Sequence, residues 1–207
     1  MSIVVKNMVL GPVMTNTYIV YDDKVKEAVI IDPADSADEI KLKVTELGVV
    51  PAAIILTHGH FDHIGAVEDL RNHYNIKVYA HEDEKAVLNS DANVASMIGK
   101  RISIEADEYL KDMQTISIGG IKYQVIHTPG HTIGSCCFYV QEEKILFSGD
   151  TMFCQSYGRT DFPTGSHSAL MNSIKGRLLK LADDVKVYPG HNEETKIGFE
   201  RQLYDFN

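Results

Sequence analysis

Four side chains that bind metal ions well lie within the segment Thr57-His58-Gly59-His60-Phe61-Asp62-His63. The segment follows residues 52–56, an apolar run that is typical of a fully buried strand. So short a loop cannot readily direct all four side chains at one ion, whereas two adjacent ions can share them. Imidazole and carboxylate ligands suit zinc, manganese or iron, and the absence of a cysteine ligand argues against a purely structural zinc site.

Three further candidate ligands, His131, Asp150 and His191, each follow a predicted strand and each have a glycine directly before them. Glycine allows a tight turn and lets a ligand approach the backbone closely. Loops at strand ends are also where folds built from sheets place their chemistry. The pattern therefore predicts a metal centre assembled from several strand ends.

The chain is predicted to contain two batches of strands, each followed by helices. We expect strands at residues 3–9, 17–21, 28–31, 52–56, 77–80, 114–118, 122–127, 135–140, 144–148 and 186–188. We expect helices at residues 35–48, 64–74, 82–89 and 166–181, whereas residues 90–109 show no clear periodicity. This pattern suits two packed sheets with helices on their outer faces, and periodicity alone leaves the topology open.

The chain has 207 residues, a length that favours a single domain over residues 1–207. Its net charge of −9 argues against binding to nucleic acid, which requires a basic surface. The sequence contains no apolar run long enough to span a membrane and no recognisable signal peptide. Three cysteines, two of them adjacent, make a poor disulfide framework, so a cytoplasmic location is expected. Nothing in the sequence indicates an obligate protein partner.

The order His-x-His-x-Asp-His, a distant His, an Asp and a last His resembles the metallo-β-lactamase superfamily. The resemblance covers nearly the whole chain. It implies an α+β fold, a four-layer αββα sandwich of two mixed β-sheets with metals at one edge. It also implies two divalent metal ions, zinc being the expected ion and iron or manganese the alternatives.

The same resemblance implies a role for each candidate ligand. The first metal would be bound by His58, His60 and His131. The second would be bound by Asp62, His63 and His191, and Asp150 would bridge the two. Asp62 would also be catalytic, because it would orient the attacking water.

Within the superfamily, residues 156–165 resemble the short bacterial hydrolases related to glyoxalase II, the hydroxyacylglutathione hydrolases. The commonest β-lactamases carry a cysteine where Asp150 stands, which disfavours antibiotic hydrolysis. Glyoxalase II proper has a helical extension after its last histidine that contacts glutathione, and this extension has no counterpart after His191. The resemblance thus implies a small-molecule thioester substrate and leaves its thiol carrier open.

The expected reaction is hydrolysis of an S-lactoyl thioester by hydroxide generated at the two metals, since such a pair lowers the pKa of water to about 7. The alternative is a persulfide dioxygenase on the same fold, which would hold one iron through His58, His131 and Asp150. A binding module without catalysis is disfavoured, because all seven ligands are present.

Two residues near the motifs have two interpretations each. Arg159 could bind an anionic group of the substrate or pair with Asp161. Asp32, in an Ile-Asp-Pro sequence, could accept a hydrogen bond from a ligand imidazole or could simply start a turn.

Overall fold

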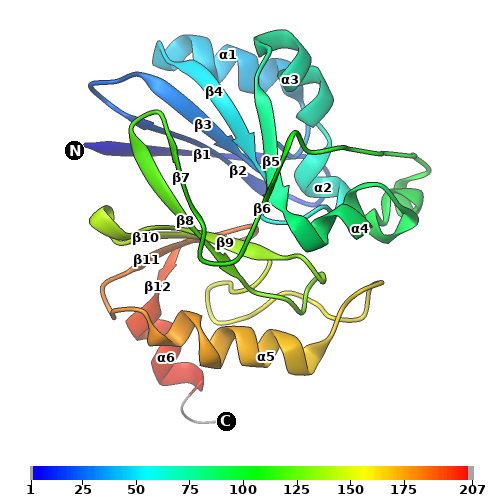
Figure 1. The fold of residues 1–207 in the computed structure, drawn as a ribbon, viewed down its shortest axis with the longest axis vertical. Coiled ribbons are helices and arrows are strands. Elements are labelled where there is room, and N and C mark those ends of the chain that lie inside the picture. The colour runs from blue at the N-terminus through cyan, green and yellow to red at the C-terminus, as the bar shows by residue number, and fades with distance from the viewer. Residues whose placement is uncertain (1, 205–207) are drawn as a thin grey trace.

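In the computed structural model, which describes residues 2–204, two six-stranded sheets pack face to face between two layers of helices (Figure 1). The α+β prediction of a four-layer αββα sandwich is confirmed. No helix among residues 2–204 has the length and apolar character needed to cross a membrane.

The first sheet is mixed. In spatial order it contains β1 (Ile3–Leu10), β2 (Thr15–Asp22), β3 (Glu27–Ile31), β4 (Val50–Ile55), β5 (Lys77–His81) and β6 (Glu108–Leu110). The first three strands are antiparallel, and β3 to β6 run parallel to one another. The parallel strands are connected through helices on the outer face, chiefly α1 (Ala37–Leu47) and α3 (Val67–Tyr74).

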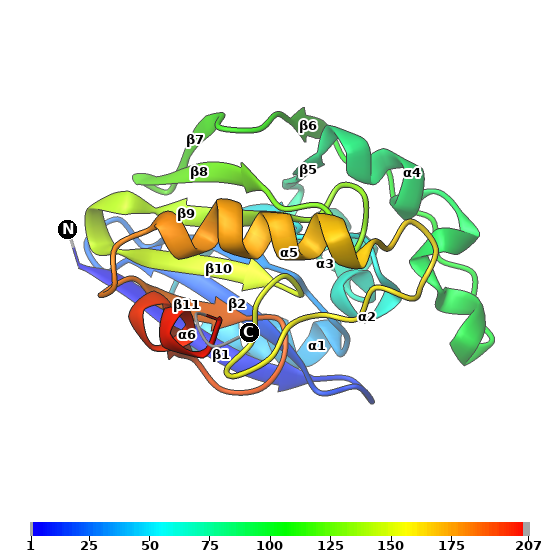
Figure 2. The same cartoon turned by 90° about the horizontal axis from the view of Figure 1, so that it is seen from below.

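The second sheet is also mixed. It contains β12 (Thr195–Lys196), β11 (Lys186–Pro189), β10 (Ile145–Gly149), β9 (Cys136–Val140), β8 (Ile121–His127) and β7 (Thr115–Ile118). Only β10 and β11 pair in parallel. Helix α5 (His167–Gly176) crosses the outer face of β9 and β10, and α6 (Ile197–Tyr204) lies beside it (Figure 2).

Three apolar layers hold the four structural layers together. Alternation along β2 sends Ile19 toward the helices and Tyr18 and Val20 toward the second sheet, as expected for a strand buried on both faces. Phe138 and Phe147 of the second sheet complete the layer between the sheets. At about 25 cal/mol per Å², burial of this apolar surface is the main force that brings the two sheets together.

Several predicted elements differ from the observed ones at their boundaries. The helix predicted at 64–74 begins three residues later, as α3, and is preceded by a separate single turn, α2 (Phe61–Ile64), because the backbone leaves helical geometry at Ala66. The helix predicted at 166–181 ends as α5 at Gly176 and continues in a 3₁₀ turn, Leu178–Lys180.

The structure adds elements that the sequence did not indicate. Helix α6 and the two-residue strand β12 were not predicted. The segment 82–89 forms a 3₁₀ turn, Glu82–Glu84, followed by the short helix α4 (Lys85–Leu88). Residues 90–109 contain two more 3₁₀ turns and β6 in place of a regular helix.

The two sheets are joined by hydrogen bonds at one edge, beyond the carboxyl end of β11. The Pro189 carbonyl accepts from the Tyr18 hydroxyl (2.6 Å) and from Asn16 Nδ2 (3.0 Å). The Asn16 backbone N–H donates to the Gly190 carbonyl (2.7 Å). These bonds bring β2 against the chain that leads into His191.

Candidate metal centre

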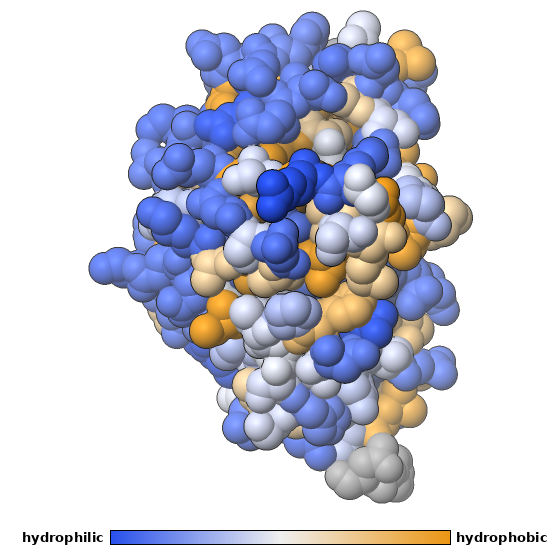
Figure 3. Space-filling model, turned by 90° about the vertical axis from the view of Figure 1, so that its right-hand side faces the viewer, coloured by the Kyte–Doolittle hydropathy of each residue, from blue (hydrophilic) through white to orange (hydrophobic). Residues whose placement is uncertain are grey.

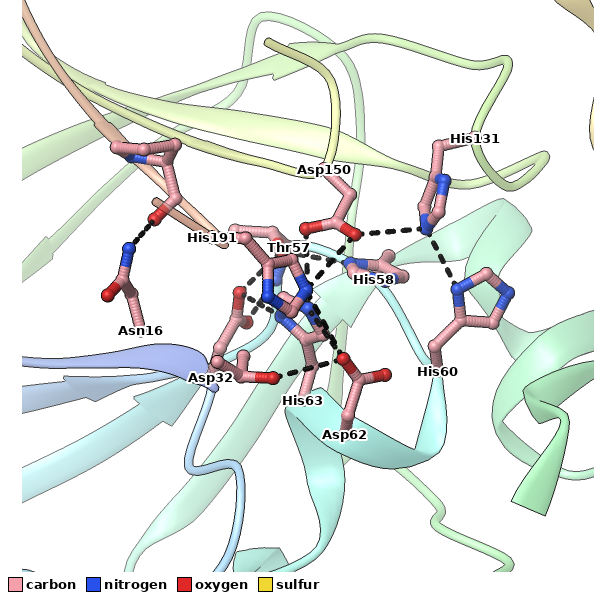
Figure 4. Close-up of polar contacts among 12 residues, drawn as sticks. Asn16, Asp32, Thr57, His58, His60, Asp62, His63, His131, Asp150 and His191 are labelled. Atoms are coloured by element: carbon pink, nitrogen blue, oxygen red, sulfur yellow. Dashed lines mark hydrogen bonds and ion pairs between the residues drawn. The ribbon is translucent and has the colours of Figure 1, made fainter. Parts of the chain in front are cut away.

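All seven predicted ligands converge at this edge of the sandwich (Figure 4). One group consists of His58, His60 and His131, and a second consists of Asp62, His63 and His191; within each, the candidate ligand atoms lie within 4.8 Å of one another. In the first group, His60 Nδ1 faces His131 Nε2 at 2.8 Å. In the second, His191 Nε2 lies 3.3 Å from Asp62 Oδ2.

Asp150 lies between the two groups. Its Oδ1 is 3.3 Å from His63 Nε2, and its Oδ2 is 3.4 Å from His131 Nε2 and 3.5 Å from His191 Nε2. One carboxylate oxygen thus faces the second group and the other faces both. This is the arrangement that a bridging carboxylate requires.

The local backbone explains how one short loop serves two groups. His58 and His60 lie on extended chain after β4, and His60 is the residue before α2. Asp62 and His63 belong to the single turn of α2, so their side chains leave the backbone in a different direction. The chain therefore divides the four side chains between two clusters.

Glycines allow the ligand loops to approach one another. A Cβ on Gly190 would lie 2.1 Å from Asp150 Oδ1, and one on Gly158 would lie 1.9 Å from the Asp150 carbonyl oxygen. Gly130 has φ +139° and passes the backbone nitrogen of Leu170 at a distance that leaves no room for a side chain. At these positions any larger residue would displace a ligand or its loop.

The polar atoms facing the centre indicate that a cation fits there. His58 Nε2 is buried and has no hydrogen-bond partner among residues 2–204, and the buried His63 Nε2 and Asp150 Oδ1 make no hydrogen bond there but face one another at 3.3 Å. Leaving a buried polar atom unpaired costs about 1–3 kcal/mol. Imidazole nitrogens and a carboxylate oxygen are the donor set that a divalent transition metal prefers.

The electrostatics of the two groups differ. Burial lowers the pKa of His58 well below its ordinary value and that of His60 to about 3, so these imidazoles are neutral at pH 7. Burial opposes protonation of His63, but the carboxylates of Asp150 and Asp62 outweigh it and hold its pKa well above the ordinary range. Neutral imidazole is the form that binds a metal, whereas a protonated one must first lose its proton.

Asp32 contacts His63 at Nδ1, the ring nitrogen that does not face Asp150. Its Oδ2 accepts from His63 Nδ1 (2.9 Å) and from the Thr57 hydroxyl (2.5 Å), and its Oδ1 accepts from the Thr57 backbone N–H (2.8 Å). Of the two interpretations of Asp32, the structure supports the hydrogen bond to a ligand imidazole. The bond leaves His63 Nε2 free to face the centre.

Replacing Asp32 by asparagine should weaken metal binding by about 10- to 100-fold, the range typical of residues that orient a metal-binding histidine. The amide cannot accept all three hydrogen bonds that the carboxylate accepts. Zinc affinity measured by competition with a chromogenic chelator tests this. Asp22→Asn is the matched control. Asp22 is also buried, but it is the last residue of β2, whereas the first residue of that strand, Thr15, lies at the metal centre. Equal losses of zinc affinity in both variants would contradict the assignment.

Arg159 contributes to the site through its backbone. The His131 Nδ1–H donates to the Arg159 carbonyl oxygen at 2.7 Å, which directs His131 Nε2 to the centre. The Arg159 guanidinium makes two bonds of 2.7 Å to Asp161 and lies 3.7 Å above the ring of Phe162. The pairing with Asp161 is thus present, and a contact between the guanidinium and a substrate stays a prediction.

Two residues near the ligands were not singled out from the sequence. The Thr15 hydroxyl donates to Asp62 Oδ2 at 3.0 Å, and Glu84 contacts two ligand loops. Neither lies near a motif along the chain. Only the pairing of distant segments brings them to the site.

A cavity of about 360 Å³ opens beside Asp62. Pro12, Phe61, Ile98 and Ile102 give it apolar walls, and Lys100 adds a positive charge. On the side of the molecule that carries α4, apolar surface gathers in the middle of the face (Figure 3).

The sequence profile of the metallo-beta-lactamase superfamily matches residues 10–191. Among curated relatives, hydroxyacylglutathione hydrolase GloC of Haemophilus influenzae is 34% identical over 198 residues, which cover 92% of each chain.

Solved structures agree with this match. The B3 metallo-beta-lactamase BLEG-1 is 42% identical with a TM-score of 0.91, covering 96% of this chain and 97% of that one. TTHA1623 in a di-iron-bound form is 34% identical with a TM-score of 0.87, covering 98% and 100%. ETHE1 from Myxococcus xanthus is 28% identical with a TM-score of 0.82, covering 97% and 82%. The fold, the clustered His and Asp residues and the profile agree that this chain belongs to the metallo-β-lactamase superfamily.

Proposed function

We propose that this protein is a metal-dependent hydrolase with two divalent ions that cleaves a thioester, as glyoxalase II enzymes do. The observation that carries the proposal is the position of Asp150 between two three-residue groups. The first ion would be held by His58, His60 and His131, and the second by Asp62, His63 and His191. The similarity to GloC over almost the whole chain supports the substrate class.

Bound in this way, two metals would supply a nucleophile at neutral pH and polarise the substrate carbonyl. The chain's own residues position the reactants. Asp62 would orient the attacking water, and the Thr15 hydroxyl donates to Asp62 Oδ2. Phe162 packs edge-on against His60 and Phe153 against His191, so each of these two imidazoles has an apolar neighbour.

The surroundings of the ligands favour a leaving group that departs without a proton. The rings of Phe153 and Phe162, which contact the ligand rings edge-on, carry no proton to donate. A thiol has a pKa of about 8.5, so a thiolate leaves without protonation far more readily than an alkoxide. The cavity beside Asp62 would take the part of the substrate that does not react.

The test is elemental analysis of protein purified from its own host, combined with hydrolysis of an S-lactoyl thioester followed by release of the free thiol. We expect two metal ions per chain and metal-dependent thiol release. Full metal content without thioester hydrolysis would overturn the substrate class. Iron rather than zinc in an active enzyme would change only the identity of the metal.

The similarity to the B3 enzyme BLEG-1 favours one second candidate, hydrolysis of a β-lactam. The aspartate at position 150 does not exclude β-lactam hydrolysis, because the cysteine expected there is a feature of the commonest β-lactamases and not of every class. A chromogenic cephalosporin in the same assay separates the two. Oxygen uptake on a persulfide, with one iron per chain, would instead support the dioxygenase alternative.

A further inference from the structure

Two buried carboxylates, Asp32 and Glu84, hydrogen-bond to the segments that carry the candidate ligands. Asp32 contacts the second group through His63. Glu84, at the end of the 3₁₀ turn that follows β5, is 1% exposed and lies behind the first group. An ionised carboxylate is costly to bury unless donors surround it, so its partners indicate what it holds in place.

The partners of Glu84 are the two loops that carry the first group. Its Oε1 accepts from the Gly59 backbone N–H at 2.7 Å, and Gly59 stands between His58 and His60. Its Oε2 accepts from the Thr132 hydroxyl at 2.8 Å, and Thr132 directly follows His131. One side chain thus connects the loop after β4 in the first sheet to the loop after β8 in the second.

A third donor completes the surroundings of Glu84. The Gly134 backbone N–H also bonds to the carboxylate. A Cβ on Gly134 would lie 2.1 Å from the Glu84 backbone nitrogen and 2.5 Å from Glu84 Oε2. On the other side, a Cβ on Gly59 would lie 3.2 Å from Glu84 Oε1. Both loops therefore approach the Glu84 carboxylate closely.

These contacts are specific to one metal position. None of the hydrogen bonds of Glu84 among the described residues reaches Asp62, His63 or His191. Its donors instead lie next to all three residues of the first group. Burial raises the pKa of Glu84 to about 7 even though three donors oppose this shift, in agreement with a site closed to water.

We propose that Glu84 is a positioning residue that sets the spacing of His58, His60 and His131, and thereby the affinity of the first metal position. Asp32 bonds to His63 of the second group and, through the Thr57 hydroxyl, also contacts the segment that carries His58, so its role is not confined to one position. The inference rests on the proposed ligand set and not on the proposed substrate. Metal affinity measured without substrate therefore distinguishes its failure from failure of the thioester proposal.

The test introduces Glu84→Gln into two backgrounds that each keep one metal position. His191→Ala leaves the first position, and His131→Ala leaves the second. The amide can still accept from Gly59, but its NH₂ group faces the donors on Thr132 and Gly134. Competition with a chromogenic chelator should show zinc affinity reduced about 10- to 100-fold in the first background and unchanged in the second.

Glu200→Gln is the matched control. Glu200 is also fully buried and accepts from the Thr195 hydroxyl (2.6 Å) and the Gln155 backbone N–H, away from both ligand loops of Glu84. Its substitution should lower thermal stability but leave the affinity of the first position within about 2-fold. The proposal would be overturned if Glu84→Gln lowered zinc affinity equally in both backgrounds. It would also be overturned if Glu84→Gln lowered thermal stability without changing zinc affinity at the first position.

A milder variant provides a second measurement if Glu84→Gln does not fold. Thr132→Val keeps the carboxyl group of Glu84 and removes one donor. It should lower affinity several-fold at the first position only. An unchanged first-position affinity in this variant would count against the proposal.

Discussion

Replacing Asp150 by alanine should reduce turnover by about 1,000-fold or more and lower the metal content from two ions per chain toward one. Asp150 is the residue placed to contact both groups, through different oxygens. Its loss should therefore exceed the 10- to 100-fold effect of residues that only orient a ligand. Metal analysis after gel filtration and steady-state kinetics on a thioester measure the two effects.

Loss of the negative charge of Asp150 is a further reason to expect a large fall in metal content and turnover. His63 and His191 both lie within 3.5 Å of Asp150, and with it they hold the second group together. Alanine would leave two imidazoles and one carboxylate, Asp62, to bind a dication. Asp150→Asn keeps the size of the side chain but offers one neutral oxygen, so it should fail in the same way.

Asp184→Ala serves as the control for Asp150→Ala. Asp184 is an exposed aspartate that pairs with Lys144 far from the ligands, and such surface pairs contribute little to stability. It should keep normal metal content and turnover. Full activity with two metals per chain in Asp150→Ala would contradict the dinuclear centre altogether.

Removing the metals with a chelator should lower the melting temperature by about 5–10 °C for each ion that is present at 100 times its dissociation constant. Such an ion stabilises the folded state by about 2.7 kcal/mol. For a chain of this size, each kcal/mol shifts the melting temperature by about 2–4 °C. Differential scanning calorimetry with and without chelator measures the shift.

The unpaired atoms at the centre explain why the shift should be large. Within the described part of the chain, His58 Nε2 is buried without a hydrogen-bond partner and Asp150 Oδ1 faces only His63 Nε2, at 3.3 Å, and a metal would satisfy both atoms. Returning one equivalent of zinc should restore part of the shift and a second equivalent the rest. In Asp150→Ala the chelator should have a smaller effect. A melting temperature independent of chelator in the wild-type protein would exclude a structural contribution from the metals.

The residues that cluster at the candidate metal centre could be anticipated from the sequence because their signal is local. A histidine or aspartate has the same ability to bind a metal whatever its position in the fold. The short spacing from His58 to His63 also restricts the directions in which those side chains can point. The layer order could be anticipated for a similar reason, since alternation and helical periodicity report burial directly.

The surroundings of the ligands depended on tertiary structure. Glu84 meets Thr132 across 48 positions of the sequence, and nothing along the chain links the two. The same holds for Thr15 and Asp62, which lie 47 positions apart. Arg159 drew attention for its guanidinium, yet its carbonyl oxygen is what contacts His131.

By itself, then, the sequence determined which side chains can bind metals and the family of sheet sandwiches in which they lie. Tertiary structure decided which buried carboxylates support those side chains. The physical reason is that ligand chemistry belongs to single residues, whereas orientation is set by hydrogen bonds between segments that only the packing of the two sheets brings together.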